Sequence, residues 1–255
     1  MEENFRKMKD EFEKAQQKVP FVDIVFCMPG HPSSGEQSVT QMNAITIMMA
    51  GATVAFRQAT GAYVYAVRND CLRGKRSKNG EMVKGQWKNQ KPFENFCDYK
   101  YIVWNDSDNH IGAEMIKRLI AYDVDIVAAY YRTSTNMSIP DNEANASCGR
   151  WDALTWENQI PYKLGEIPSL PRNKKGLVEV DFTGWGLCAM KKGVFEALAY
   201  PWFRHKLMEW TDEDGEECAE MTTDDPEICQ RIKAAGFKIY IDPTMRIIHE
   251  KRCKI

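Results

Sequence analysis

The first half of the chain alternates continuous apolar segments with segments whose apolar residues recur at helical spacing. The apolar segments cover residues 21–28, 53–56, 101–105 and 126–131, and the helical patterns lie at about residues 37–50, 62–72 and 112–122. A strand covered by helices on both faces is apolar throughout, because neither of its faces meets water. The alternation therefore predicts an α/β fold class, with a mostly parallel, doubly wound sheet over the first 131 residues.

One of these apolar segments ends in two carboxylates, Asp106 and Asp108. Alternate residues of an extended chain share a face, so both carboxylates lie on one side where the strand leaves the sheet. Two like charges this close favour a bound cation, and hard oxygen ligands suit Mn²⁺ or Mg²⁺. Open α/β sheets bind ligands beyond the carboxyl ends of their strands, which favours a metal-diphosphate site here. The alternative is that Asp108 only caps the helix that begins near Gly112.

The composition excludes several classes of protein. With 44% apolar and 27% charged residues, the 255-residue chain has the composition of a soluble globular protein. Its formal net charge of −2 argues against a nucleic-acid binder. No segment reaches the roughly 18 apolar residues that span a bilayer, and the N-terminus lacks the apolar core of a signal peptide. We therefore expect no transmembrane segment and a cytoplasmic protein, with peripheral membrane attachment as an alternative.

Two charged segments lie outside the alternating pattern. Residues 1–20 are expected to form an N-terminal helix, because apolar side chains recur at helical spacing among alternating charges over residues 3–18. Residues 75–91 are rich in lysine and lack apolar periodicity. That segment is either a solvated insertion or a mobile basic lid over an acidic or phosphorylated ligand.

The second half of the chain is less regular. Residues 132–175 look like polar loops, and order returns with expected strands at 176–182 and 187–190 and a short helix at 193–198. A further helix is expected from about Asp224 to Gly236, with a capping residue and Pro226 in its first turn. Two strands at 237–241 and 245–248 then lead to His249.

Four segments, taken in chain order, resemble motifs of the GT-A glycosyltransferases, including family-2-like and mannan-polymerase-like members. They are Ala66–Asn69, Tyr101–Asp108, Val180–Gly186 with the Lys191–Phe195 that follows, and Thr223–Arg231 leading to His249. The resemblance implies a single Rossmann-like GT-A domain over residues 21–250, with a mostly parallel central sheet and a smaller acceptor-side subregion. Residues 21–131 would bind the nucleotide sugar, and residues 132–250 would bind the acceptor.

The resemblance also implies a role for each site residue. Asp106 and Asp108, with His249 as a further ligand, would hold Mn²⁺ or Mg²⁺ against the donor diphosphate. Asp225 would be the general base, and Asp224 would contact sugar hydroxyls. The expected donor-binding residues are Pro29, Gly30, His31, Arg68, Asn69, Asp106, Ser107 and Asp108. The expected acceptor-binding residues are Gly184, Trp185 and Gly186, with the Trp185 ring stacked on a sugar.

Each of these roles has a simpler alternative. His249 could be a solvent-facing residue near the end of the chain, and Trp185 could belong to the core. Asp224 and Asp225 could only cap their helix and complement its dipole.

The resemblance predicts a metal-dependent and inverting glycosyltransferase that uses a UDP- or GDP-sugar and a saccharide or glycan acceptor. Two other functions stay open. One is a nucleotidyltransferase that makes nucleotide sugars, although the segment from Pro29 to Gly35 lacks the arginine or lysine expected there. The other is a carbohydrate-binding protein without turnover.

Overall fold

The computed structural model describes residues 19–30, 51–73, 90–94, 96–151, 159–212 and 214–249, with the backbone alone for His110 and His249. Three predicted features therefore lie outside the described residues. These are the N-terminal helix over residues 3–18, the helix at 37–50, and all but the end of the lysine-rich segment. His31, one of the expected donor-binding residues, lies outside them as well.

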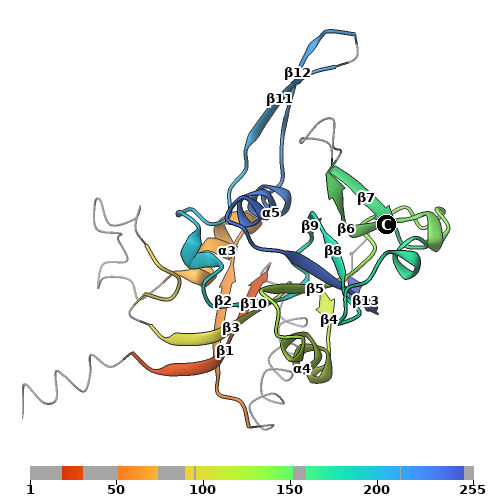
Figure 1. Ribbon diagram of the computed structural model, residues 1–255. Coiled ribbons are helices and arrows are strands. Elements are labelled where there is room, and N and C mark those ends of the chain that lie inside the picture. Colours follow the sequence, from red (N-terminus) through yellow and green to blue (C-terminus); the bar gives the residue numbers. More distant parts are fainter. Residues whose placement is uncertain are drawn as a thin grey trace, which may run out of the picture.

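Seven strands form the main sheet, in the order β2-β1-β3-β10-β5-β13-β8 (Figure 1). They are β1 (Phe21–Gly30), β2 (Val54–Thr60), β3 (Asp98–Asn105), β5 (Ile126–Tyr130), β8 (Val178–Val180), β10 (Leu187–Lys191) and β13 (Ile239–Arg246). Three neighbouring pairs are parallel, namely β1–β2, β1–β3 and β5–β13. The other three, β3–β10, β5–β10 and β8–β13, are antiparallel.

The predicted mostly parallel, Rossmann-like GT-A sheet is therefore wrong. The sheet is mixed, because the second half of the chain contributes β10 and β8 in the direction opposite to the other five strands. Further small sheets of the described chain are antiparallel throughout. They pair β6 (Asn145–Trp151) with β7 (Gln159–Lys163) and β9 (Phe182–Thr183), β11 (Leu207–Thr211) with β12 (Glu217–Met221), and β4 (Asn109–His110) with β14 (Ile248–His249).

Helices cover both faces of the main sheet. Side chains of α4 (Ala113–Ala121) pack on one face, together with Phe26, Val103 and Val127. Side chains of α3 (Val64–Leu72) and α5 (Asp224–Ala234) pack on the other face, in the cluster that holds Ile102 and Trp104 (Figure 1). Consecutive residues of β3 thus enter different parts of the core, which explains why its sequence is apolar without interruption.

Several sequence predictions can be compared with these elements. The strands expected at 21–28 and 126–131 and the helices expected at 62–72 and 112–122 are confirmed within a few residues as β1, β5, α3 and α4. The helix expected at 193–198 is a short 3₁₀ helix at Phe195–Ala197, and further 3₁₀ helices lie at Asp141–Glu143 and Ile167–Ser169. The expectation of polar loops over residues 132–175 is wrong in part, because this region contains strands β6 and β7.

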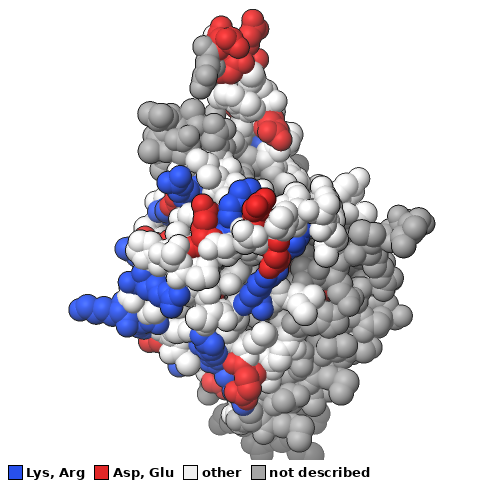
Figure 2. Space-filling view, turned by 90° about the vertical axis from the view of Figure 1, so that its right-hand side faces the viewer, with Lys and Arg blue, Asp and Glu red and all other residues white. Residues whose placement is uncertain are grey.

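A β-hairpin made of β11 and β12 projects from the body of the molecule (Figure 1). The acidic residues Asp212, Asp214, Glu216 and Glu217 lie at its tip, where acidic side chains gather in Figure 2. At the base of the hairpin, the Thr222 backbone N–H donates to the Lys206 carbonyl at 2.9 Å. The hairpin therefore leads directly into the first turn of α5.

Two absences can be stated for the described part of the chain. None of its helices is long and apolar enough to cross a membrane. The seven cysteines that it contains form no disulfide bond with one another.

The close packing of β6 predicts that Gly149 tolerates no side chain. A Cβ at this position would lie 2.2 Å from the Ile160 carbonyl oxygen and 2.6 Å from Cζ of Phe182. We expect Gly149→Ala to lower the free energy of unfolding by about 1–3 kcal/mol in urea titrations, the usual cost of overpacking. Gly112→Ala is the control, because a Cβ there meets no atom within 4 Å. Equal losses in the two variants would contradict the prediction.

Candidate functional site

Three segments that are far apart in the sequence meet where β3 leaves the sheet. They are α3, the turn that follows β3, and the first turn of α5, and they bring Arg68, Asp106, Asp224 and Asp225 together. Because β3 ends at Asn105, Asp106 is the first residue beyond the strand. The site therefore lies at the carboxyl end of a central strand, where the sequence placed it.

Arg68 binds all three carboxylates of the cluster. Its Nη1 donates to Oδ2 of Asp224 at 2.9 Å and also to Oδ1 of Asp225. Its Nη2 donates to Oδ2 of Asp106 at 3.2 Å. Only 3% of Arg68 is exposed, and a cation buried this deeply is tolerated only with charged partners. The Arg68 pairs are therefore a condition for burying this part of α3.

The cluster holds more negative than positive charge. Three carboxylates surround one guanidinium, and their combined attraction raises the pKa of Arg68 well above its usual value although burial alone would lower it. Burial raises the pKa of Asp225 to about 7, against the opposing effect of Arg68 and with a further rise from Asp224 and Asp106. A carboxyl group that titrates near neutral pH can exchange protons with a substrate.

The turn that carries Asp106 and Ser107 is held by its neighbours. The Asp106 N–H donates to the Gly186 carbonyl at 3.0 Å, and the Ser107 N–H donates to the Pro29 carbonyl at 3.3 Å. Gly30 leaves room for Ser107, because a Cβ on Gly30 would lie 2.6 Å from the serine Oγ. The structure thus brings the expected donor-binding residues Pro29, Gly30 and Ser107 into contact at one corner of the site.

The end of the described chain returns to this turn. In the β4–β14 pair, His249 lies opposite Asn109, the residue that follows Asp108. The backbone of His249 thus lies next to the turn that carries Asp106 and Asp108, and carboxylate and histidine ligands are compatible with Mn²⁺. Among the side chains that the structure describes, which exclude His249, no group of three has the arrangement of a metal site. Metal binding by these residues remains a prediction.

Tyr131 is a residue of the site that the sequence did not single out. It is 7% exposed, and burial, followed by the charges of Asp225 and Asp106, raises the pKa of its phenol well above the usual value. A Cβ on Gly184 would lie 2.3 Å from the Tyr131 hydroxyl, and a Cβ on Gly186 would lie 2.6 Å from Cε1 of its ring. The two glycines therefore make room for Tyr131, which gives them a structural reason apart from the expected role in binding an acceptor.

The expected acceptor platform, Trp185, is part of the core. It is 1% exposed, and its ring centroid lies 6.1 Å from that of Trp104 and 5.3 Å from that of Phe203. A ring enclosed in this way presents no face to a sugar. The prediction that Trp185 stacks on a sugar is therefore wrong, and Trp185 is a core residue.

Asn69 is also structural. Its Nδ2 donates to the Phe203 carbonyl at 2.6 Å, and its Oδ1 accepts from the Phe203 N–H at 3.1 Å. The side chain thus fastens α3 to the segment before the hairpin. This corrects its expected role in binding the donor, since these bonds occupy both ends of the amide.

Asp224 and Asp225 do more than complement the dipole of α5. The N-cap residue Thr223 makes no capping hydrogen bond with its side chain, and both aspartates direct their carboxylates to Arg68. They differ in exposure, since the side chain of Asp224 is 4% exposed and that of Asp225 is 27% exposed. Asp225 can therefore meet a ligand, whereas Asp224 is enclosed, which corrects its expected contact with sugar hydroxyls.

The raised pKa of Asp225 predicts a specific pH dependence of stability. Between about pH 4 and pH 7 the folded protein holds a proton that the unfolded chain has released, so this group makes stability fall as the pH rises. Asp225→Asn removes that contribution, and its free energy of unfolding should fall less steeply over this window. Urea titrations in EDTA at several pH values measure the slope, with Asp214→Asn at the hairpin tip as the control. An unchanged slope in Asp225→Asn would rule out the raised pKa.

Comparisons with known proteins add little about function. No family model matches the chain, and no curated protein matches it. Four chains of solved structures match, among them the crystal structure of A197 from STIV. That chain is 15% identical, with 90% of this chain and 86% of that chain covered and a TM-score of 0.46. A similarity of this strength carries no argument about chemistry, so the function has to be argued from the residues of the site.

Proposed function

We propose that this protein is a metal-dependent glycosyltransferase that moves a sugar from a UDP- or GDP-sugar to a hydroxyl group of a saccharide acceptor, with inversion. The observation that carries the proposal is the convergence of Asp106 and Asp225 on Arg68 at the end of β3. Sugar transfer needs an electrostatic partner for a diphosphate leaving group and a base for the attacking hydroxyl. Both kinds of group lie within one cluster.

The donor side of the site is the turn after β3. Asp106 and Asp108 would hold the divalent ion, which supplies charge stabilisation to the diphosphate as the bond to the sugar breaks. Arg68 adds a permanently charged guanidinium, and its Nε is buried without a hydrogen-bond partner among the described residues.

The acceptor side is the first turn of α5. Asp225 is partly exposed and titrates near neutral pH, so its carboxylate can take the proton of an attacking hydroxyl group. Asp224 is enclosed and pairs with Nη1 of Arg68, which positions the guanidinium.

The products of a nucleotide-sugar assay test the proposal against the two alternatives. The protein is incubated with UDP- and GDP-sugars and Mn²⁺, with and without saccharide acceptors. A glycosyltransferase releases a nucleoside diphosphate, and the release rises with acceptor. A nucleotidyltransferase instead releases pyrophosphate when it is given a nucleoside triphosphate and a sugar phosphate. A binding protein releases neither product but still shows a thermal shift with its ligand.

Removal of one expected metal ligand should separate catalysis from folding. Asp108→Asn should abolish Mn²⁺-dependent transfer, because it removes one of the two carboxylates that would hold the ion. Calorimetric titration with Mn²⁺ should show weaker binding by the variant. Its circular dichroism spectrum should match that of the unsubstituted protein. Full activity of the unchanged protein in excess EDTA would contradict the role of a metal.

Replacement of the proposed base should affect rate and leave donor binding intact. Asp225→Asn keeps the size of the side chain but cannot accept a proton, so transfer should fall by about two to four orders of magnitude. The affinity for UDP or GDP with Mn²⁺ should change little. If Asp225 acts only at the helix terminus, the asparagine variant will retain its rate, because asparagine caps a helix about as well as aspartate. Asp214→Asn is the matched control.

A further inference from the structure

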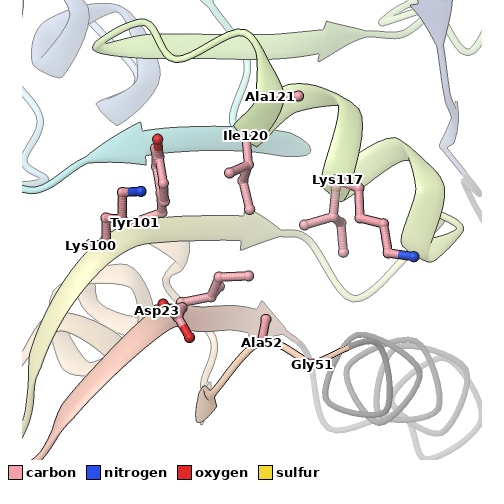
Figure 3. Close-up of a pocket in the computed structure, with 10 residues that line it drawn as sticks. Asp23, Gly51, Ala52, Lys100, Tyr101, Lys117, Ile120 and Ala121 are labelled. Carbon is pink, nitrogen blue, oxygen red and sulfur yellow. The ribbon is translucent and has the colours of Figure 1, made fainter.

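A pocket lies at the opposite end of the main sheet from the carboxylate cluster. It has a volume of about 460 Å³ and is lined by residues in the first halves of β1 and β3, the second half of α4, and the residues before β2 (Figure 3). Its lining residues Lys100 and Tyr101 precede Asp106 by five or six positions along β3, which is about 17–20 Å of extended chain. A ligand in this pocket would therefore be separate from the site described above.

The floor of the pocket is apolar. Ile24 of β1 and Ile116 and Ile120 of α4 line it, and Ile24 and Ile116 are almost fully buried. In Figure 3 the Ile120 side chain extends from α4 into the space above β3. Ligand pockets in proteins commonly have volumes of about 300–1,000 Å³ and a mainly apolar lining with few polar groups. The volume and floor suit an alkyl chain or a small ring.

The charged groups at the rim are unequally available. Asp23 accepts from the N–H of Thr53 at 2.8 Å and from its hydroxyl at 2.6 Å, and these bonds lower the pKa of Asp23. Lys117 pairs with Glu114 at 2.8 Å. The Lys100 ammonium instead lies 5.4 Å from the centre of the Tyr101 ring, beside the pocket, and its charge makes a smaller contribution to the lowered pKa of Asp23. Among the described lining residues, Lys100 is thus the cation best placed to receive an anion.

We propose that this pocket binds an amphipathic anion, with its charged group at Lys100 and its apolar part against Ile24, Ile116 and Ile120. The proposal does not depend on the function of the carboxylate cluster. A fatty-acid-like carboxylate in solution and an anionic lipid in a bilayer share this chemistry. Alkyl carboxylates are suitable probes, because chain length and charge can be varied separately.

Calorimetric titrations of the full chain with hexanoate, octanoate and decanoate, each below its micelle concentration, test the apolar part. Burial of the alkyl chain should tighten binding about four-fold for each added methylene. Octanol should bind more weakly than octanoate, because it lacks the charge. Vesicles of phosphatidylglycerol, compared with phosphatidylcholine, form the second arm and show whether a bilayer lipid supplies the anion. Affinity that is independent of chain length, or no binding in either arm, would overturn the proposal.

Three variants test whether the ligand binds in this pocket. Lys100→Gln should weaken the binding of octanoate by about two- to five-fold, the range expected for loss of one partly exposed ion pair. The affinity for octanol should stay unchanged. Lys117→Gln is the matched control and should change little, since its charge is already paired with Glu114. Ala121→Phe fills the pocket from an exposed lining position and should abolish binding of both compounds. Unchanged binding in a folded Ala121→Phe variant would refute the assignment to this pocket. The nucleotide-sugar assay on the same variants keeps this outcome distinct from the proposed transfer activity.

Discussion

The buried charge of Arg68 is the constraint on which the site depends. A guanidinium that is almost fully removed from water is stable only with close carboxylates, and its partners come from the turn after β3 and from the start of α5. The two ends of this network are more than 150 residues apart in sequence, as the separation of 156 between Arg68 and Asp224 shows. One side chain thus sets the relative positions of α3, β3 and α5. Removing it would leave three carboxylates facing one another in a largely dry environment, and a cost of this kind typically exceeds the net value of the original pairs.

The local structure of the first half could be predicted because burial leaves a direct mark on the sequence. The uninterrupted apolar residues of β3 and the two carboxylates after them located both the strand and the end of the strand at which the site lies. The start of α5 could be located in the same way, from Pro226 and the acidic residues around it. In each case a single segment carries the information, and no knowledge of its neighbours is needed.

The remaining features depend on contacts between distant segments. A short apolar strand such as β10 has the same composition whichever way it runs, so the antiparallel direction of β10 and β8 could not be read from the sequence. The same limit explains Gly184 and Gly186. A glycine signals close approach by another group, but the sequence does not say whether that group is a ligand or, as here, the ring of Tyr131. Trp185 likewise has equal reason to line a cleft or a core until its neighbours Trp104 and Phe203 are known.

The closed base of the projecting hairpin has a consequence for how this chain can vary. Lys206 and Thr222 are joined by hydrogen bonds of 2.9 and 3.1 Å, so the chain enters and leaves the hairpin at almost the same point. Apart from the buried Met208, the described residues between them are mostly exposed, and a change in their number leaves the distance that the chain must bridge unchanged, which is the geometry of sites that accept inserted sequences. The acidic hairpin leads into the first turn of α5, which carries Asp224 and Asp225. A hairpin of another length or sequence could therefore change what approaches these carboxylates while the Arg68 network stays as it is.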